Sequence, residues 1–301
     1  MREKNTPPPG LLLLNKRAGL TSFDSLAAVK RAFASGKVGH TGTLDKFAEG
    51  LMLVLTGKAL KLSRWFTHVD KRYAGTVRFG AETDTLDPEG AVIAEAPLPQ
   101  REAVQRVLAG FTGRIEQAPP EYSAIHIGGQ RASALARQGM APQMKKRPVE
   151  VFRLELTFWE PPVAGIAVHC SGGTYIRSLA RDIALAAGSR AHLTALRRTA
   201  VAGFGLEEAV GGEGDLTAAL RPVGPGVFTA LGIPVVQVSP PVAAAVASGK
   251  PLHEAVIPEA LALPAEASAA ALFTGDALLA VIERRGDTGR RWAYGYVWGR
   301  G

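Results

Sequence analysis

Residues 39–50 read GHTGTLDKFAEG and present one carboxylate that could do chemistry, Asp45, in a run of small residues. Asp45 follows glycines and threonines, and a basic residue, Lys46, comes directly after it. A single carboxylate in such a setting can act as a nucleophile or as a base. The alternative is purely structural, because an aspartate beside glycine and threonine often accepts backbone N–H groups in a turn or a helix cap.

Other kinds of catalytic site are disfavoured by the motifs that the chain lacks. It contains no GxSxG elbow, no phosphate-binding P-loop and no glycine-rich Rossmann spacing after a strand. The six histidines are scattered and Cys170 is the only cysteine, so metal-ligand spacings are missing and no internal disulfide can form. A lone cysteine of this kind is typical of a small buried apolar residue.

The elements expected around Asp45 follow from the spacing of apolar residues. The run at 11–14 predicts a buried strand, and the run at 51–55 predicts another apolar segment. Between them, Thr21 to Asp24 resembles a capping box before a helix that Gly36 would end. Asp45 therefore falls in a glycine- and threonine-rich loop between a helix and an apolar segment.

The centre of the chain alternates strand and helix patterns. Residues 73–79 and 152–158 alternate apolar and polar side chains, which predicts half-buried strands. Residues 101–111 and 174–188 carry apolar side chains at helical spacing. In the second of these helices, Arg177 lies off the apolar stripe, on the same face as Arg181.

Composition predicts three parts of the chain. Residues 1–9 end in three prolines and are expected to be a flexible leader. The breaker-rich stretches GGEGD and RPVGPG mark a boundary, so we expect a main domain over 10–232 and a small, mostly β domain over 233–301. The expected fold class is α+β. Aromatic residues alternating over 292–298 favour a hairpin whose rings pack in a core, although such rings could also stack on bases.

The net charge of +8 is concentrated at one end of the sequence. Residues 1–80 hold 14 of the 35 Lys and Arg but only 5 of the 27 Asp and Glu. Such an excess suggests an anionic partner, most plausibly nucleic acid, although a solvated basic face is an equally good account of the charge alone. No apolar run approaches the ~20 residues that span a bilayer, so we expect no membrane association and a cytoplasmic protein.

Six stretches, in this order and at this spacing, resemble the TruB family of bacterial tRNA pseudouridine synthases from about Gly10 to Phe204. They read GLLLLNKRAGLTSFD, GKVGHTGTLDKFAEGLMLVLTGKALK, DKRYAGTVRFGAETDTLDPEG, PPEYSAIHIGGQRASALARQG, RPVEV and HCSGGTYIRSLARDIA with AHLTALRRTAVAGF. The part from about Ile233 is similar, more loosely, to the PUA-type RNA-binding domain. The resemblance implies a mixed, largely antiparallel sheet with flanking helices and a central cleft.

The resemblance also implies an activity, the isomerisation of uridine-55 in the tRNA T-loop without a metal, nucleotide or redox cofactor. Asp45 matches the family's active-site aspartate, and the residues leave open whether it attacks the base, attacks the sugar or removes a proton. Tyr73 matches a tyrosine that lies against the flipped base, and Arg177 matches an arginine that pairs with the aspartate. His40 matches a histidine that fills the space left in the T-loop. Extruding the base costs on the order of a few kcal/mol, which stacking can partly return.

Further substrate contacts are expected by the same resemblance. Lys16 and Asp84 correspond to polar positions of the cleft. The basic stretch from residue 131 to 147 corresponds to a loop that clamps the T-arm, with salt-dependent phosphate contacts expected. Its cations are Arg131, Lys145, Lys146 and Arg147, besides Arg137. The family expectation is a monomer bound to tRNA.

Two features depart from the family pattern, because Arg17 and Lys46 stand where prolines are common. Two other functions remain open at this point: an RNA-binding protein or folding chaperone without chemistry, and a synthase that acts on another RNA.

Overall fold

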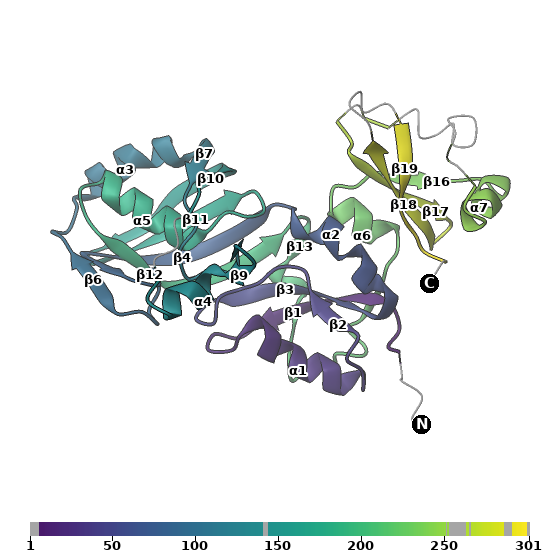
Figure 1. Cartoon of the computed structure of the whole chain (residues 1–301), viewed down its shortest axis with the longest axis horizontal. Helices are drawn as coiled ribbons and strands as arrows, with labels where there is room; N and C mark the ends of the chain where they lie inside the picture. The colour runs from purple at the N-terminus through teal and green to yellow at the C-terminus, as the bar shows by residue number, and fades with distance from the viewer. Residues whose placement is uncertain are drawn as a thin grey trace.

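The computed structural model describes residues 6–140, 144–250, 252, 263–264, 266–285 and 291–299, and it contains a large sheet and a smaller C-terminal sheet (Figure 1). The helices are α1 (Ser22–Ala32), η1 (Gly57–Leu62), α2 (Ser63–Thr67), α3 (Arg101–Leu108), η2 (Ala109–Phe111), α4 (Ala132–Arg137), α5 (Ile176–Ala186), η3 (Leu206–Glu208), α6 (Pro225–Ala230) and α7 (Pro240–Ala247).

The large sheet runs in the order β14-β1-β3-β12-β4-β11-β10-β7, with β2, β13 and β15 paired at its side. Its strands are β1 (Gly10–Lys16), β2 (Val38–His40), β3 (Glu49–Thr56), β4 (Lys71–Phe79), β7 (Gly113–Gln117), β10 (Arg147–Glu160), β11 (Val163–Cys170), β12 (Ala191–Val201), β13 (Phe204–Gly205), β14 (Val210–Gly211) and β15 (Arg221–Pro222). Two pairs, β1 with β14 and β3 with β12, are parallel and the others are antiparallel. The expected mixed, largely antiparallel sheet is therefore confirmed.

The leucine run at the start of the chain forms a strand that is buried on both faces. Leu12 and Leu14 of β1 pack with side chains of α1 on one face. Leu11 and Leu13 pack on the other face with α2 and the C-terminal sheet. Burial on both faces explains why this strand is a continuous apolar run rather than an alternating one. The helix on the first face begins at the expected capping box, in which Thr21 and Asp24 exchange hydrogen bonds.

Helices α3 and α5 cover one face of the middle strands. Leu179, Ala180 and Ile183 of α5 pack with Val104 of α3 and with side chains of β4, β11 and β12. The helices expected over 101–111 and 174–188 correspond to α3 with η2 and to α5, and the strands expected over 73–79 and 152–158 lie within β4 and β10. This layer places the beginning of α5 beside the loop between β2 and β3.

Two short hairpins lie in the loops that connect the strands of the large sheet, near the residues of the candidate active site. One pairs β5 (Ala81–Thr83) with β6 (Val92–Glu95), and the other pairs β8 (His126–Ile127) with β9 (Gln130–Arg131). The turn within the first hairpin and the chain just before the second both contribute backbone carbonyls to the site described below.

The C-terminal sheet has the order β16-β17-β18-β19 and packs against η1 and α2 of the large domain (Figure 1). Its strands are β16 (Val235–Gln237), β17 (Ala269–Thr274), β18 (Ala277–Arg285) and β19 (Arg291–Val297). One apolar cluster joins Trp65 and Phe66 of α2 to Phe273 and Val281 of this sheet. The boundary at residue 232 precedes the first C-terminal strand, but the division into domains stays a prediction, because the packing is continuous across it.

The expected leader lies partly outside the described residues, since residues 1–5 are not among them. Residues 6–9 form no helix or strand, yet Pro7 is buried and the carbonyl of Pro8 accepts a hydrogen bond from Thr56 at 2.6 Å. The end of this segment is thus held against β3.

Candidate active site

The loop that carries Asp45 is held by the segment just before α1 and by the first residues of that helix. The Ser22 hydroxyl accepts a hydrogen bond from the Leu44 N–H at 2.8 Å and donates one to the Leu44 carbonyl at 2.9 Å. The Gly19 N–H donates to the Lys46 carbonyl at 2.8 Å. Because these bonds fix the backbone on both sides of Asp45, the loop is positioned by contacts rather than by its own flexible sequence.

Lys16 completes this hold from the end of β1. Its side chain is 1% exposed, and its ammonium donates to the carbonyls of Arg17, Lys46 and Ala48. Burial lowers the pKa of Lys16 to about 8. Lys16, which was expected to line the substrate cleft, is therefore a buried support of the Asp45 loop, and it does not line the cavity described below.

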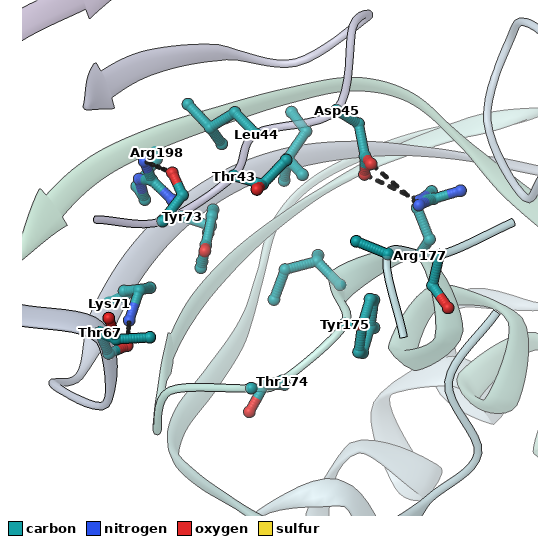
Figure 2. A pocket seen from close by; sticks show the side chains of 16 residues that line it. Thr43, Leu44, Asp45, Thr67, Lys71, Tyr73, Thr174, Tyr175, Arg177 and Arg198 are labelled. Atoms are coloured by element: carbon teal, nitrogen blue, oxygen red, sulfur yellow. Dashed lines mark hydrogen bonds and ion pairs between the residues drawn. The ribbon is translucent and has the colours of Figure 1, made fainter. Parts of the chain in front are cut away.

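Arg177, near the start of α5, forms a two-point ion pair with Asp45 (Figure 2). Its Nε lies 2.9 Å from Oδ2, and its Nη2 donates to Oδ1 at 2.9 Å. The Arg177 side chain is 4% exposed, whereas that of Asp45 is 36% exposed. A planar guanidinium matches both oxygens of a carboxylate and so fixes its orientation as well as its charge.

The same guanidinium also binds a second acid, Asp87, which the sequence did not single out. Its Nη1 lies 3.2 Å from the Asp87 carboxylate and donates to the Thr85 carbonyl at 2.7 Å, while Nη2 also donates to the Tyr122 carbonyl at 3.1 Å. The Asp87 side chain is 6% exposed. Arg177 therefore ties together the Asp45 loop, the turn after β5 and the chain before β8.

The surroundings of Asp45 disfavour its ionised form overall. Burial raises the pKa of Asp45, the charge of Arg177 lowers it, and the neighbouring Asp87 raises it, with a net rise above the ordinary aspartate value of 3.8. A partly dehydrated carboxylate whose position is fixed can attack an electrophilic carbon or remove a proton without first shedding its water.

A cavity of about 310 Å³ opens beside Asp45 (Figure 2). Tyr73 of β4 is 8% exposed and contributes its ring to the wall; burial raises the pKa of its phenol, and Arg198 hydrogen-bonds it. The lining residues are Gly42, Thr43, Leu44, Asp45, Thr67, Lys71, Tyr73, Ser123, Ala124, Gly173, Thr174, Tyr175, Ile176, Arg177, Leu196 and Arg198. Apolar and aromatic walls with a few fixed polar groups are typical of a small-ligand site.

Two further residues named from the sequence lie outside this cavity. His40 is half-buried on β2, and burial, with a smaller effect of Arg198, lowers its pKa and favours the neutral ring. Asp84 accepts from the Ala91 N–H at 3.0 Å and from the Tyr122 hydroxyl. Asp84 thus stabilises the turn that presents Asp87, while the structure does not bring it or His40 to the cavity wall.

The basic stretch flanks the cavity without lining it. Arg131 ends β9, and Lys145, Lys146 and Arg147 lead into β10; all four side chains are exposed. Residues 141–143 lie outside the described part of the chain. Ser123 and Ala124 belong to the cavity wall, and the chain after Arg131 is hydrogen-bonded to this segment. The charge of Arg147 acts on the cavity-lining Tyr175, so Arg131 and Arg147 lie near the cavity. Their exposure leaves them accessible to an anionic ligand in solvent.

The cavity also contains two buried cations that the sequence argument missed, Lys71 and Arg198, which are 8% and 2% exposed. A signal existed for both. Lys71 stands two positions before Tyr73 and Arg198 two positions after Leu196, so in a strand each shares a face with its cavity-lining neighbour. Asp87 had no comparable signal, because it lies in an irregular acidic turn.

Neither a metal site nor a membrane span was found in the described ranges. Within them, no group of three or more His, Cys, Asp and Glu residues could hold a metal ion. Likewise, none of the helices in those ranges is long and apolar enough to cross a membrane.

Comparisons with known proteins assign the chain to a family. Residues 30–176 match the family model described as TruB family pseudouridylate synthase, N-terminal domain. The tRNA pseudouridine synthase B of Treponema denticola is 47% identical over 216 residues, which span 65% of this chain and 60% of that protein. The protein of the same name in Bordetella avium is 45% identical over 213 residues, which span 69% of this chain and 87% of that protein.

The fold likeness extends farther along the chain. A solved structure described as the archaeal box H/ACA sRNP Nop10–Cbf5 complex matches with a TM-score of 0.69 at 21% identity. The match covers 96% of this chain and 86% of that chain, so it includes the C-terminal sheet. The similarity in sequence shows that this chain belongs to the TruB family of pseudouridylate synthases.

Proposed function

We propose that this protein isomerises uridine to pseudouridine in tRNA, at position 55 of the T-loop, with Asp45 as the catalytic group and without a cofactor. The observation that carries the proposal is the Asp45 carboxylate, fixed at two points by a buried guanidinium beside a cavity of about 310 Å³. Such a cavity has room for one extruded nucleotide but not for a stacked duplex. The relatives named tRNA pseudouridine synthase B support the choice of substrate.

The reaction breaks the bond between uracil N1 and the ribose C1′, turns the base, and joins C5 to C1′. Asp45 serves as nucleophile or base, and Arg177 keeps it ionised and oriented. Tyr73 and Tyr175 offer rings against which an extruded base can lie, which returns part of the cost of unstacking. One carboxylate suffices, because no water enters the product and no second acid must activate one.

The RNA contacts around the cavity form part of the proposal. We assign phosphate contacts to Arg131, Lys145, Lys146 and Arg147, and T-loop contact to His40. Lys16 and Asp84 support the loops rather than the RNA, as their hydrogen bonds suggest. The C-terminal sheet is proposed to bind the body of the tRNA, and the protein to act as a monomer in the cytoplasm.

The test uses an unmodified T-arm stem-loop and, as a control, the same stem-loop with the target uridine replaced. The wild-type protein should form pseudouridine only in the first RNA. Asp45→Asn should form none while still shifting the RNA in a gel, whereas Asp276→Asn, a matched change in an exposed turn, should behave as wild type. RNA binding by the wild type without any product would replace the enzyme by an RNA-binding protein.

A further inference from the structure

The cavity has a second polar side, away from Asp45, formed by two buried cations. Figure 2 shows Lys71 and Arg198 on the side of Tyr73, with Asp45 and Arg177 on the other. The two cations come from neighbouring strands, β4 and β12. Gly42 lies over both: a Cβ built there would be 3.6 Å from Nη1 of Arg198 and 3.8 Å from Cε of Lys71. They form one continuous patch, named here the cationic floor.

Backbone oxygens hold the cationic floor in place. The Lys71 ammonium donates to the carbonyls of Thr67 at 3.1 Å and Val69 at 2.7 Å. Arg198 donates through Nε to the Leu51 carbonyl at 2.7 Å and through Nη2 to the Gly42 carbonyl at 3.2 Å. These bonds fix both positive groups before any ligand arrives.

In the described part of the chain, neither cation of the floor is paired with a carboxylate. Among the described residues, no ion pair joins either side chain to an acid, although ion pairs are present elsewhere in the same domain. Burial, and next the charge of Arg198, lower the pKa of Lys71 to about 8. Two buried like charges without a directly paired acid are costly, and a ligand that brings negative charge to them lowers that cost.

We propose that Lys71 and Arg198 stabilise the negative charge that develops on the uracil ring during the reaction, by contact with its carbonyl oxygens. This inference rests on the proposed function and names two catalytic groups of the same site. Preorganised donors aimed at developing charge are often the largest contribution to catalysis in a closed site.

The charge arises by every route left open for Asp45. If the C1′–N1 bond breaks first, its electron pair stays on N1 and spreads over the ring carbonyls. The positive charge left on the sugar is then removed in one of two ways: Asp45 bonds to C1′, or the C2′ proton is transferred to Asp45. If Asp45 instead adds to the ring at C6, the displaced electron pair moves to O4 as an enolate. In each case C5 then bonds to C1′ with the electron pair of the ring, which removes the negative charge, and Asp45 is released: its bond to C1′ or C6 breaks, or it returns the proton to C2′. C5 finally loses its proton and N1 gains one, which gives neutral pseudouridine.

A base fits the cationic floor better than a phosphate does. A phosphodiester continues into the RNA chain on both sides, so it needs an open path, whereas an extruded base is an end group. The floor is nearly closed to solvent, with Lys71 and Arg198 at 8% and 2% exposure, while Asp45 remains 36% exposed at the other side. The Tyr73 ring lies on the side of the cationic floor, where a base stacked on it can contact the two cations (Figure 2).

The experiment compares Lys71→Met and Lys71→Gln with Lys71→Arg in single-turnover pseudouridine formation and in RNA binding. Gln keeps a donor for the carbonyls of Thr67 and Val69, so a loss shared with Met reports the charge rather than the fold. We expect both neutral variants to react about 10²-fold more slowly, with the RNA dissociation constant unchanged within about twofold, and Arg to recover most of the rate. Rates within about threefold of wild type would overturn the inference.

If the neutral variants lost RNA affinity instead of rate, and the salt dependence of that affinity fell by about one phosphate contact, the cationic floor would bind a phosphate. That result would also overturn the inference. Absence of product with the wild-type protein would reject the proposed function itself.

The intact protein gives a further measurement, because its rate should fall as pH rises past about 8, where Lys71 loses its proton. The groups facing Lys71 are Arg198, Asp70 and Cys170, and the thiol pKa is raised to about 11.

Lys71→Arg should move this fall to higher pH, because a guanidinium stays charged. Ionisation of the uracil substrate would lower the rate equally in both proteins. An unmoved fall in the arginine variant would therefore contradict the role of Lys71.

Discussion

Replacing Arg177 with methionine should destabilise the protein severely, because two acids and two backbone carbonyls lose the guanidinium that binds them. Each ion pair contributes about 4 kcal/mol at ~4 Å and an effective dielectric constant of ~20. The desolvation of a side chain that is 4% exposed offsets much of that gain. Removing one partner of a buried pair costs about 3–5 kcal/mol, and we expect a loss in that range for Arg177→Met.

The two acids should then differ, although they share the same guanidinium. Asp87 is 6% exposed and also accepts from the Thr85 hydroxyl at 2.6 Å and the Glu89 N–H at 3.0 Å. Asp87→Asn should therefore cost about 2–3 kcal/mol, as for a hydrogen bond to a charged group. Asp45→Asn should cost less than Asp87→Asn, because the guanidinium keeps Asp87 and because the pKa of Asp45 is raised in the fold, so that its ionisation opposes folding above the unfolded pKa.

Urea unfolding followed by near-UV circular dichroism measures all three variants, and pseudouridine formation is assayed in parallel. The pattern expected is an unstable Arg177→Met, a destabilised but partly active Asp87→Asn, and a more stable but inactive Asp45→Asn. A loss below 1 kcal/mol for Arg177→Met, or a larger loss for Asp45→Asn than for Asp87→Asn, would refute the reasoning. Arg177→Lys, which keeps the charge but not the fork, should fall between methionine and wild type.

Three further predictions follow from the same contacts. Activity should fall at low pH as Asp45 is protonated, with a midpoint above the ordinary value of 3.8, and an unchanged midpoint in a single-turnover pH series would contradict the burial effect. Ser22→Ala, which removes both bonds to Leu44, should cost about 1–3 kcal/mol and slow single turnover without weakening RNA binding; a change in affinity alone would argue against a loop-positioning role. Trp298→Ala, which removes the ring 4.7 Å from Lys58, should speed proteolytic separation of the two sheets, and unaltered cleavage would show that this contact is dispensable.

The strands and helices of the large domain were largely predictable, because their patterns are local. The capping box at Thr21 and the apolar stripe of α5 act over a few residues, and both are present as expected. The order of the strands was not predictable in this way. The parallel pairing of β12 with β3 joins residues far apart in the sequence, and only the family resemblance indicated such a sheet.

The candidate site divides along the same line. Asp45 stands out because it lies alone in a loop of small residues, and its pairing with Arg177 was implied by the resemblance. Asp87 could not be selected from the acidic turn, since its direction depends on the chain path at Leu86, whose φ of 61° is rare for a leucine. Lys71 and Arg198 looked like the polar positions of half-buried strands, and only the packing of both strands shows that they meet.

The aromatic segment at the end of the chain, which had no functional account in the sequence, links the two parts of the molecule. Lys58 lies 4.7 Å from the Trp298 ring and Lys61 lies 5.6 Å from the Tyr296 ring, so both cations of η1 face β19 and the residues after it. The following helix, α2, ends at Thr67, whose carbonyl holds Lys71 in the cavity. The same short helical segment therefore supports the C-terminal sheet at one end and the cationic floor at the other. Because packing already fixes their relative position, an RNA that contacts both meets a preorganised surface and loses less entropy on binding.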